Sequence, residues 1–295
     1  MKKVGIFGAS RQVSRSYLIK RMFDRLRSLG LEVYVDKRYF DALNETVEDT
    51  LPCNGLIESD NFDLDIAMSI GCDGTFLKTA ARIGNKGIPI LGVNQGRLGF
   101  LTDINRNDLD DAVEDIFKNY YRIEERTLLQ LCPKASEHIT GYNFALNEVA
   151  IMKRDTSSML SIQTYINGDY LTTYQADGLV IATPTGSTAY SLSLNGPIIV
   201  PTASNLVLTP IAPHSLNVRP LVISDECEIR VIVESRSNTF LVALDGRSET
   251  FPTGKEFCVS KAPYTTKVIK RHAHNFFETL SEKLMWGLDS RVTES

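Results

Sequence analysis

The stretch that decides the fold is LDIAMSIGCDGTFLKTAARIG, residues 64–84. Its first seven residues are largely apolar and predict a buried strand, whereas Phe76–Ile83 predicts a helix closed by Gly84. The turn GCDGT, residues 71–75, joins the two. A strand that passes through a glycine-bearing turn into a helix is typical of a parallel α/β sheet. Ligands of such sheets usually bind at this end of the strands, where the start of the helix favours anions.

The sequence on both sides continues this alternation of strands and helices. Further strands of the same sheet are predicted at residues 3–7, 31–35 and 88–93. A helix is predicted over Ser14–Leu29, followed by Gly30 in the position of a helix-ending glycine. Another is predicted from a cap at Asn105 or Asn107 to Lys118. Residues 44–61 show a less regular, polar pattern that includes a turn.

From about residue 121 the pattern changes to short apolar runs that predict β-strands. Asn167-Gly168 lies between two of these runs and indicates a hairpin. Helical periodicity returns only at residues 276–286. The fold class is therefore predicted as α/β plus all-β. We expect a parallel-sheet α/β domain (residues 1–120), a β-sandwich-like domain (121–270) and a C-terminal helical segment (271–295) that returns to the first domain.

The composition indicates a globular protein and excludes several classes of function. The chain has 295 residues, a formal net charge of -4 and 43% hydrophobic residues. No basic field is evident for a nucleic acid, and no apolar run is long enough to span a bilayer. The first residues, MKKVGIFG, are too short in their apolar part for a signal peptide. Five scattered cysteines without CxxC spacing favour reduced thiols in a cytoplasmic protein over a zinc or disulfide framework.

A second stretch with chemical content is DGLVIATPTGSTAYS, residues 177–191. A carboxylate and a short strand lead into what is predicted to be a loop of Thr, Ser, Gly and Pro. Such a loop exposes backbone N–H groups together with hydroxyls, which suits a phosphate or a sugar. It lacks the lysine of a Walker-type P-loop. Taken alone, it is equally typical of a hairpin rich in turn formers.

Three further polar positions interrupt apolar surroundings. Asp73 would be repelled by a phosphate, so it is predicted to be a general base or a residue that supports a metal ion, with a helix N-cap as the alternative. The pair Asn147-Glu148 interrupts an apolar strand and can hold vicinal hydroxyls or an adenine edge. Asp245-Gly246-Arg247 is predicted to be a tight structural turn.

Taken in order, these motifs resemble those of the NAD kinase family over most of the chain. The GxDG turn alone is shared with lipid kinases and phosphofructokinases, whereas the run TPTGSTAYS in this order is far more specific. The motifs that carry the resemblance are GCDGT (71–75), GRLGFLTD (96–103), NE (147–148), DG (177–178), TPTGSTAYSLS (183–193) and RPLVI (219–223).

The resemblance implies an enzyme that transfers the γ-phosphate of ATP to the adenosine-ribose 2′-hydroxyl of NAD, giving NADP. It implies a divalent cation, Mg²⁺ or Mn²⁺, and a homodimer or homotetramer; no residue is assigned as a metal ligand. Asp73 would accept the proton of the hydroxyl, and Gly74 and Thr75 would lie against phosphate.

Further site residues follow from the same resemblance. Asn147 and Glu148 would hold adenosine, and Asp177 would face the nicotinamide side. The adenine and ribose pocket is expected to be lined by Thr188, Ala189, Tyr190 and Ser193. The expected nucleotide-binding set is completed by Lys78, Gln175, Ser191, Asp245 and Arg247.

Three positions depart from the family pattern. Arg247 follows Asp245-Gly246 where a neutral amide is expected. Cys72 stands where the family usually has a second glycine, and a side chain there is expected to restrict a positive φ. Gln175 is neutral where some relatives carry a cation, so preference between NAD and NADH stays open. Two alternatives also remain: a lipid kinase that shares the GxDG turn, and a non-catalytic NAD(P)-binding sensor. A lipid kinase would require apolar or basic surface segments for a membrane, which the sequence does not show.

Overall fold

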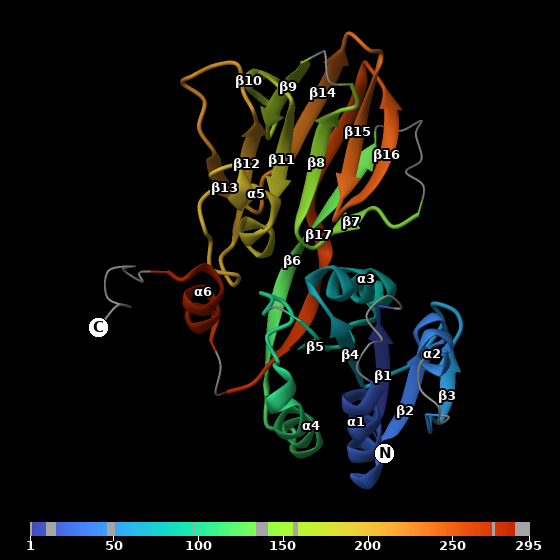
Figure 1. The fold of residues 1–295 in the computed structure, drawn as a ribbon. Coiled ribbons are helices and arrows are strands. Elements are labelled where there is room, and N and C mark those ends of the chain that lie inside the picture. The colour runs from blue at the N-terminus through green and yellow to red at the C-terminus, as the bar shows by residue number, and fades with distance from the viewer. Residues whose placement is uncertain are drawn as a thin grey trace. The chain divides into compact units, whose positions relative to one another are not determined.

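The structure is a computed structural model that describes residues 2–9, 16–45, 51–96, 98–133, 141–155, 159–272 and 275–286. The chain divides into two compact units, each with its own core. Unit 1 comprises Met1–Glu125 and Lys267–Ser295, and unit 2 comprises Arg126–Thr266. Figure 1 shows the elements of both. No helix of the described residues is long and apolar enough to cross a membrane.

Unit 1 is built on a parallel sheet with the strand order β3-β2-β1-β4-β5. Its strands are β1 (Lys3–Gly8), β2 (Glu32–Asp36), β3 (Gly55–Ile57), β4 (Ile66–Gly71) and β5 (Ile90–Asn94). The end of β17 (Lys255–Lys270) joins in parallel to β5, with Val268 opposite Ile90. The order reverses between β1 and β4, and ligands of open α/β sheets bind outside the carboxyl ends of the strands at such a point. The turn after β4 lies there.

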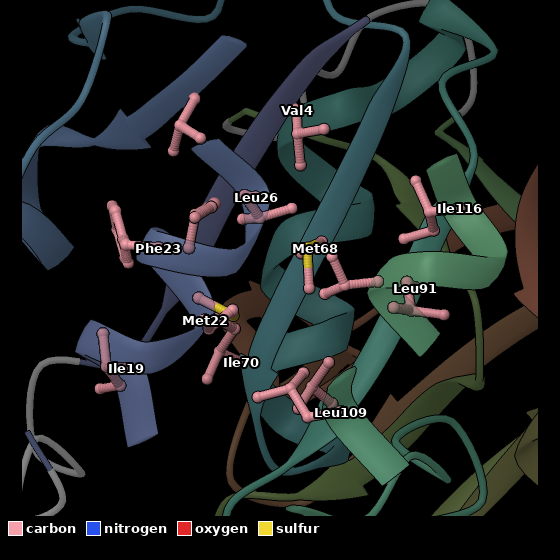
Figure 2. Close-up of a cluster of buried hydrophobic side chains, with 14 of the residues drawn as sticks. Val4, Ile19, Met22, Phe23, Leu26, Met68, Ile70, Leu91, Leu109 and Ile116 are labelled. Atoms are coloured by element: carbon pink, nitrogen blue, oxygen red, sulfur yellow. The ribbon is translucent and has the colours of Figure 1, made fainter. Parts of the chain in front are cut away.

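Helices cover both faces of this sheet. The helices of unit 1 are α1 (Ser16–Ser28), α2 (Lys37–Asn44), α3 (Asp73–Ile83), α4 (Leu109–Lys118) and α6 (Phe276–Leu284), with short 3-10 turns at Gly84–Lys86 and Arg106–Asp108. Phe23 of α1 and Ile116 of α4 pack with Met68 and Leu91 on one face, as Figure 2 shows. Successive strand residues point to opposite faces. Ser69 therefore faces the other side, where its hydroxyl accepts a hydrogen bond from Thr79 of α3 (3.1 Å).

Unit 2 consists of two sheets whose strands pair antiparallel in the registers that the structure defines. The first has the order β10-β9-β14-β17, and the second has the order β13-β12-β11-β8-β15-β16. The first sheet contains β9 (Leu160–Ile166), β10 (Asp169–Ala176), β14 (Ile229–Ser235) and part of β17, while β6 (Arg122–Pro133) pairs with β17 and with β7 (Phe144–Ala145). The second contains β8 (Glu148–Lys153), β11 (Gly178–Ala182), β12 (Asn205–Ile211), β13 (Leu221–Ser224), β15 (Thr239–Leu244) and β16 (Arg247–Pro252).

The two sheets of unit 2 enclose one apolar core. Ile162 and Phe257 of the first sheet share it with Ile151 and Leu179 of the second. On the outer face of the second sheet, a smaller cluster that includes Val180 is covered by residues after α5 (Tyr190–Ser193). The predicted fold class is confirmed. A parallel-sheet α/β part is followed by a β-sandwich-like part, and the last helix belongs to the α/β unit.

Several local predictions were wrong or incomplete. Helix α2 and strands β3, β13 and β16 were not predicted, because each is short and depends on its neighbours; β3, for example, adds three residues beside β2. Residues 185–193 form a 3-10 turn (Thr185–Thr188) and α5 instead of an open loop. Helix α4 begins after Asp108, so neither Asn105 nor Asn107 is its cap. Two predicted features lie outside the described residues: the helix start at Ser14, and Arg97 of the motif GRLGFLTD (96–103).

The expectation for Cys72 was also wrong. Its φ is −98°, in the extended region that any residue adopts, so a side chain causes no backbone strain there. The preceding Gly71 has φ +154°, and a Cβ at that position would lie 2.4 Å from the hydroxyl oxygen of Thr75. Glycine is therefore required at position 71 and not at position 72.

The core of unit 1 allows a stability prediction. Phe23 is fully buried, so Phe23→Ala is expected to lower the free energy of unfolding by about 3–5 kcal/mol, because a cavity replaces the ring. Phe117→Ala on α4 is the control, since that ring is 45% exposed. Urea unfolding followed by circular dichroism measures both variants. Equal effects of the two substitutions would contradict the prediction.

Candidate active site

Asp73 is the first residue of α3, and Cys72 alone separates it from the carboxyl end of β4. Its carboxylate does not cap its own helix; Cys72 occupies the N-cap position without a side-chain bond. Instead, Asp73 accepts hydrogen bonds from the backbone N–H groups of Phe100 (2.9 Å), Leu101 (3.1 Å) and Thr102 (3.0 Å), and from the Thr102 hydroxyl (2.9 Å). The helix-cap alternative is thereby wrong for Asp73.

The charge state of Asp73 follows from these contacts. Burial alone would raise its pKa, but Lys283 of α6, with Nζ 3.4 Å from Oδ2, acts in the opposite direction. The hydrogen bonds from Phe100 and Thr102 add to the effect of Lys283, and together they hold the pKa of Asp73 below its usual value. Asp73 is therefore an ionised carboxylate at neutral pH.

Two glycines let the segment 99–102 approach Asp73. A Cβ on Gly99 would lie 2.0 Å from Asp73 Oδ1, and a Cβ on Gly92 would lie 2.1 Å from the carbonyl oxygen of Leu101. Immediately beyond the segment, the Asp103 carboxylate and the Lys270 ammonium form a buried pair at 2.6 Å. Residues 99–102 of the motif at 96–103, for which the sequence predicted no role, thus support Asp73, and Gly99 is the signal that could have indicated it.

The other predicted residues of unit 1 lie along the first turns of α3. Gly74 is exposed and has no side chain to keep a ligand from the backbone. Thr75 is buried, and its N–H donates to the carbonyl of Cys72 (2.8 Å). Lys78 is exposed one turn further along. The start of this helix carries the positive end of its dipole, which favours an anion.

In unit 2, three strand ends bring Asn147, Glu148 and Asp245 together. Glu148 begins β8 and lies opposite Ala182, the last residue of β11, while Leu244 at the end of β15 lies opposite Val149. Asp245 follows at once in a turn with positive φ (49°) and accepts from the N–H groups of Leu146, Asn147 and Glu148 at 2.8, 2.8 and 3.3 Å. The carboxylate thus orients the segment that carries Asn147 and Glu148.

The pKa values of Asp245 and Glu148 are shifted in the direction opposite to that of Asp73. Burial raises the pKa of Asp245, and its hydrogen bonds to backbone N–H groups offset this only in part. Burial, and then the charge of Asp245, raise the pKa of Glu148 to about 7, although the Tyr190 N–H donates to it. Asn147 Oδ1 and Glu148 Oε2 are buried and accept no hydrogen bond from the described residues. Buried acceptors of this kind are usually satisfied, so these two oxygens fit donors of a ligand.

The hydroxyls of residues 183–193 mostly stabilise the segment itself. The Thr183 hydroxyl donates to the carbonyl of Leu146 (2.6 Å), and the buried Ser191 hydroxyl pairs with that of Thr209 (2.9 Å). A Cβ on Gly186 would lie 2.1 Å from the carbonyl oxygen of Asn147, so this glycine permits close packing. Five residues of the segment remain at least partly accessible, namely Thr188, Ala189, Tyr190, Leu192 and Ser193.

The remaining predicted residues lie elsewhere in unit 2. Asp177 precedes β11 and is therefore about 16 Å along the strand from its other end, where Glu148 lies. It pairs with Lys153 (2.7 Å), and Gln175 donates to the hydroxyl of Ser161 (3.0 Å). Arg247 donates hydrogen bonds to the backbone carbonyls of Tyr142 and Phe144. These bonds fix the chain beside the Asp245 turn.

The described residues contain no group of three or more His, Cys, Asp or Glu side chains that could hold a metal ion. A cation that enters with substrate phosphates needs few protein ligands, because Mg²⁺ retains several waters and binds phosphate oxygens.

The strand order of unit 1, with a glycine-bearing turn where that order reverses, is that of open α/β proteins, which bind their ligands at this edge of the sheet. Comparison with known proteins defines the family. The profile of the ATP-NAD kinase N-terminal domain matches residues 4–121, and that of the ATP-NAD kinase C-terminal domain matches residues 146–271. The NAD kinase of Bacteroides fragilis is 52% identical over 98% of this chain and 100% of its own. The NAD kinase of Porphyromonas gingivalis is 44% identical over 97% of this chain and 99% of its own. The chain belongs to the NAD kinase family.

Solved structures agree in fold. Yeast NADH kinase complexed with NADH has a TM-score of 0.88 at 23% identity, with 100% of this chain and 90% of that chain covered. An NAD kinase from Archaeoglobus fulgidus in complex with ATP has a TM-score of 0.76 at 23% identity, with 96% and 98% covered. The predicted family and its enzyme class, an ATP-dependent NAD kinase, are confirmed, and this assignment is favoured over the lipid-kinase and sensor alternatives.

The support of Asp73 can be tested with two glycines of one loop. Gly99→Ala is expected to lower the free energy of unfolding by about 1–3 kcal/mol, because the added methyl group would overlap the Asp73 carboxylate. Gly96→Ala is the matched control, since a Cβ there meets nothing within 4 Å. Chemical denaturation of both variants measures the difference, and a Gly99→Ala variant as stable as the control would refute the packing argument.

Glu148 gives a prediction about pH. A buried carboxyl group whose pKa is raised to about 7 from 4.5 binds a proton on folding, so its charge destabilises the folded state as pH rises through that window. Glu148→Gln cannot ionise. We expect little difference from wild type at pH 5 and about 1–3 kcal/mol greater stability of the variant at pH 8.

Thermal unfolding across pH 5–8 measures this difference. Glu234→Gln, at an exposed carboxylate of β14, is the control and should show no such trend. A constant difference between Glu148→Gln and wild type at all pH values would show that Glu148 does not titrate in this range.

Proposed function

We propose that this chain transfers the γ-phosphate of ATP to the adenosine-ribose 2′-hydroxyl of NAD, giving NADP, with Asp73 as the proton acceptor. The observation that carries the proposal is the ionised Asp73 carboxylate, held by N–H groups of residues 100–102 at the start of α3. In the reaction a bond forms between the ribose O2′ and the γ-phosphorus while the bond from that phosphorus to ADP breaks. The hydroxyl proton passes to Asp73.

The hydrogen bonds of Asp73 indicate which of its oxygens takes the proton. Oδ1 accepts three bonds, from the Leu101 N–H and from both donors of Thr102. Oδ2 accepts one bond from Phe100 and the longer contact of Lys283. A carboxylate has about four acceptor sites, so Oδ2 has capacity for the hydroxyl. A low pKa makes Asp73 a weak base, which suits a loose transition state that requires little activation of the nucleophile.

The phosphate groups of ATP are assigned to the start of α3. Gly74 offers accessible backbone, Thr75 shapes the turn, and Lys78 supplies a positive charge one turn later. The NAD kinase from Archaeoglobus fulgidus, which shares this fold, was solved in complex with ATP. The divalent cation, Mg²⁺ or Mn²⁺, is proposed to arrive on the phosphates of ATP and to neutralise part of their charge.

NAD recognition is assigned to unit 2. The unsatisfied oxygens of Asn147 and Glu148 would accept from ribose hydroxyls or from the adenine amino group. The exposed ring of Tyr190 offers a surface on which a base can stack, and yeast NADH kinase, of the same fold, was solved with NADH. Thr188, Ala189 and Ser193 complete the proposed pocket wall.

The other predicted residues of unit 2 have proposed roles that follow from where they lie. The proposed pocket is stabilised by three residues that bond to other protein groups and not to the ligand, namely Ser191, Asp245 and Arg247. Asp177 and Gln175 are assigned to the nicotinamide side, since they lie at the other end of β11 from Glu148. A homodimer or homotetramer and a cytoplasmic location, both expected from the sequence, belong to this proposal.

Asp73→Asn tests the proposal. The amide cannot accept the proton, so NADP formation from ATP, Mg²⁺ and NAD is expected to fall by about 10²–10⁴-fold. Binding of NAD, measured by calorimetry, is expected to stay near the wild-type value because the binding residues are in unit 2. A fully active variant would exclude Asp73 as the base. Loss of NAD binding together with activity would indicate a structural defect instead.

A further inference from the structure

The C-terminal helix α6 contacts the support of Asp73 at two points. The Phe276 ring lies 6.1 Å from the Phe100 ring, and the Lys283 ammonium lies 4.5 Å from the centre of that same ring. Lys283 also reaches Asp73 Oδ2 at 3.4 Å. No motif of the sequence marked Lys283, because it is more than 200 positions from Asp73 along the chain.

The helix is locally well defined, which lets it act as a fixed support. Asn275 caps it through the N–H groups of Phe277 and Glu278, and the Glu278 side chain bonds back to the N–H of Asn275, which completes a capping box. Leu280 is buried. The backbone that carries Lys283 is therefore positioned by bonds that do not involve Asp73.

We propose that Lys283 is a positioning residue for phosphoryl transfer: from α6 it clamps Phe100 and Asp73 together and fixes the orientation of the Asp73 carboxylate. Phe100 is the link, because its N–H donates to Oδ2 while its ring lies under the Lys283 ammonium. A cation above an aromatic face and beside a carboxylate is attracted by both. This proposal rests on the proposed role of Asp73 as proton acceptor.

The other groups around Asp73 do not duplicate this role. The segment 99–102 presents N–H groups and the Thr102 hydroxyl, which are neutral. Asp103, further along, is occupied by Lys270. The adjacent Cys72 thiol is exposed and lies 3.9 Å from the Thr75 hydroxyl. Lys283 supplies the charge that acts on Asp73 from the described part of the chain.

The test compares Lys283→Gln and Lys283→Arg with wild type. Loss of the ammonium is expected to reduce kcat about tenfold, because a misplaced reacting group loses much of the advantage of orientation. The KM for NAD should change less than twofold. Arg retains the charge and should restore most of kcat. Lys37→Gln, which removes an exposed lysine of α2 that pairs with Asp41, is the charge-matched control and should match wild type.

A second readout does not depend on activity. With carboxyl-labelled aspartate, ¹³C NMR can follow the titration of Asp73, whose signal is the one missing in Asp73→Asn. In Lys283→Gln the pKa of Asp73 is expected to rise toward its ordinary value, because the stabilising charge is lost. A purely structural role of α6 would lower thermal stability and leave this titration unchanged.

The outcomes separate the two proposals. Unchanged kcat and unchanged Asp73 titration in Lys283→Gln would overturn the positioning role while Asp73 remains the base. A higher kcat would show that Lys283 blocks Asp73, and a raised KM for ATP alone would show that it binds phosphate; either result overturns the proposal. Full activity of Asp73→Asn would refute the base itself, whatever the titration shows.

Discussion

The site in unit 1 depends on one interaction, the carboxylate of Asp73 with the backbone N–H groups of residues 100–102. These bonds tie the start of α3 to the segment after β5. Because the partners are backbone groups, the interaction is possible only where the backbone can come close, and the absence of a Cβ at Gly99 and Gly92 provides that space. A buried carboxylate without such donors would tend to be protonated. The same bonds that shape the turn therefore keep its charge.

The pKa values of Asp73 in unit 1 and Glu148 in unit 2 are shifted in opposite directions. Asp73 receives hydrogen bonds and a neighbouring ammonium, and its pKa is lowered. Glu148 is buried beside Asp245, and its pKa is raised. The physical difference is the number of donors and cations aimed at each carboxyl group. In the proposed function, the carboxylate that would accept the proton is thus ionised beforehand, whereas the carboxyl group proposed to hold adenosine has a raised pKa. This division agrees with separate roles in chemistry and in recognition.

The segment 183–193 has a different role from the one its composition suggested. Its hydroxyls and its glycine suggested a loop that binds a phosphate or a sugar, with a turn-rich hairpin as the alternative. In the fold, Thr183, Ser187 and Ser191 direct their hydroxyls to carbonyls or to Thr209, so they stabilise the segment. What remains accessible is a short rim around Tyr190, next to the acceptors of Asn147 and Glu148. Rigidity of this kind benefits recognition, because a fixed wall loses little entropy when a ligand binds.

The sequence by itself determined the elements with strong periodicity and the order of the motifs. The strand that ends at Gly71, the inner face of α4 and the Asn167-Gly168 hairpin follow from local pattern, since the physics that forms them acts over a few residues. Strand β3 was missed because it is only three residues long and is held by pairing with β2 from another part of the chain, whereas α2 was missed although the adjacent Asp36 caps it locally.

Only the tertiary structure decided what surrounds each functional side chain. It placed Asp245 under Asn147, and Lys283 beside Asp73 from the far end of the chain. Local sequence can nominate a carboxylate, but its pKa and orientation depend on burial and on donors contributed by other segments. Those donors are largely backbone N–H groups, which every residue except proline possesses, so no residue type in the sequence identifies them.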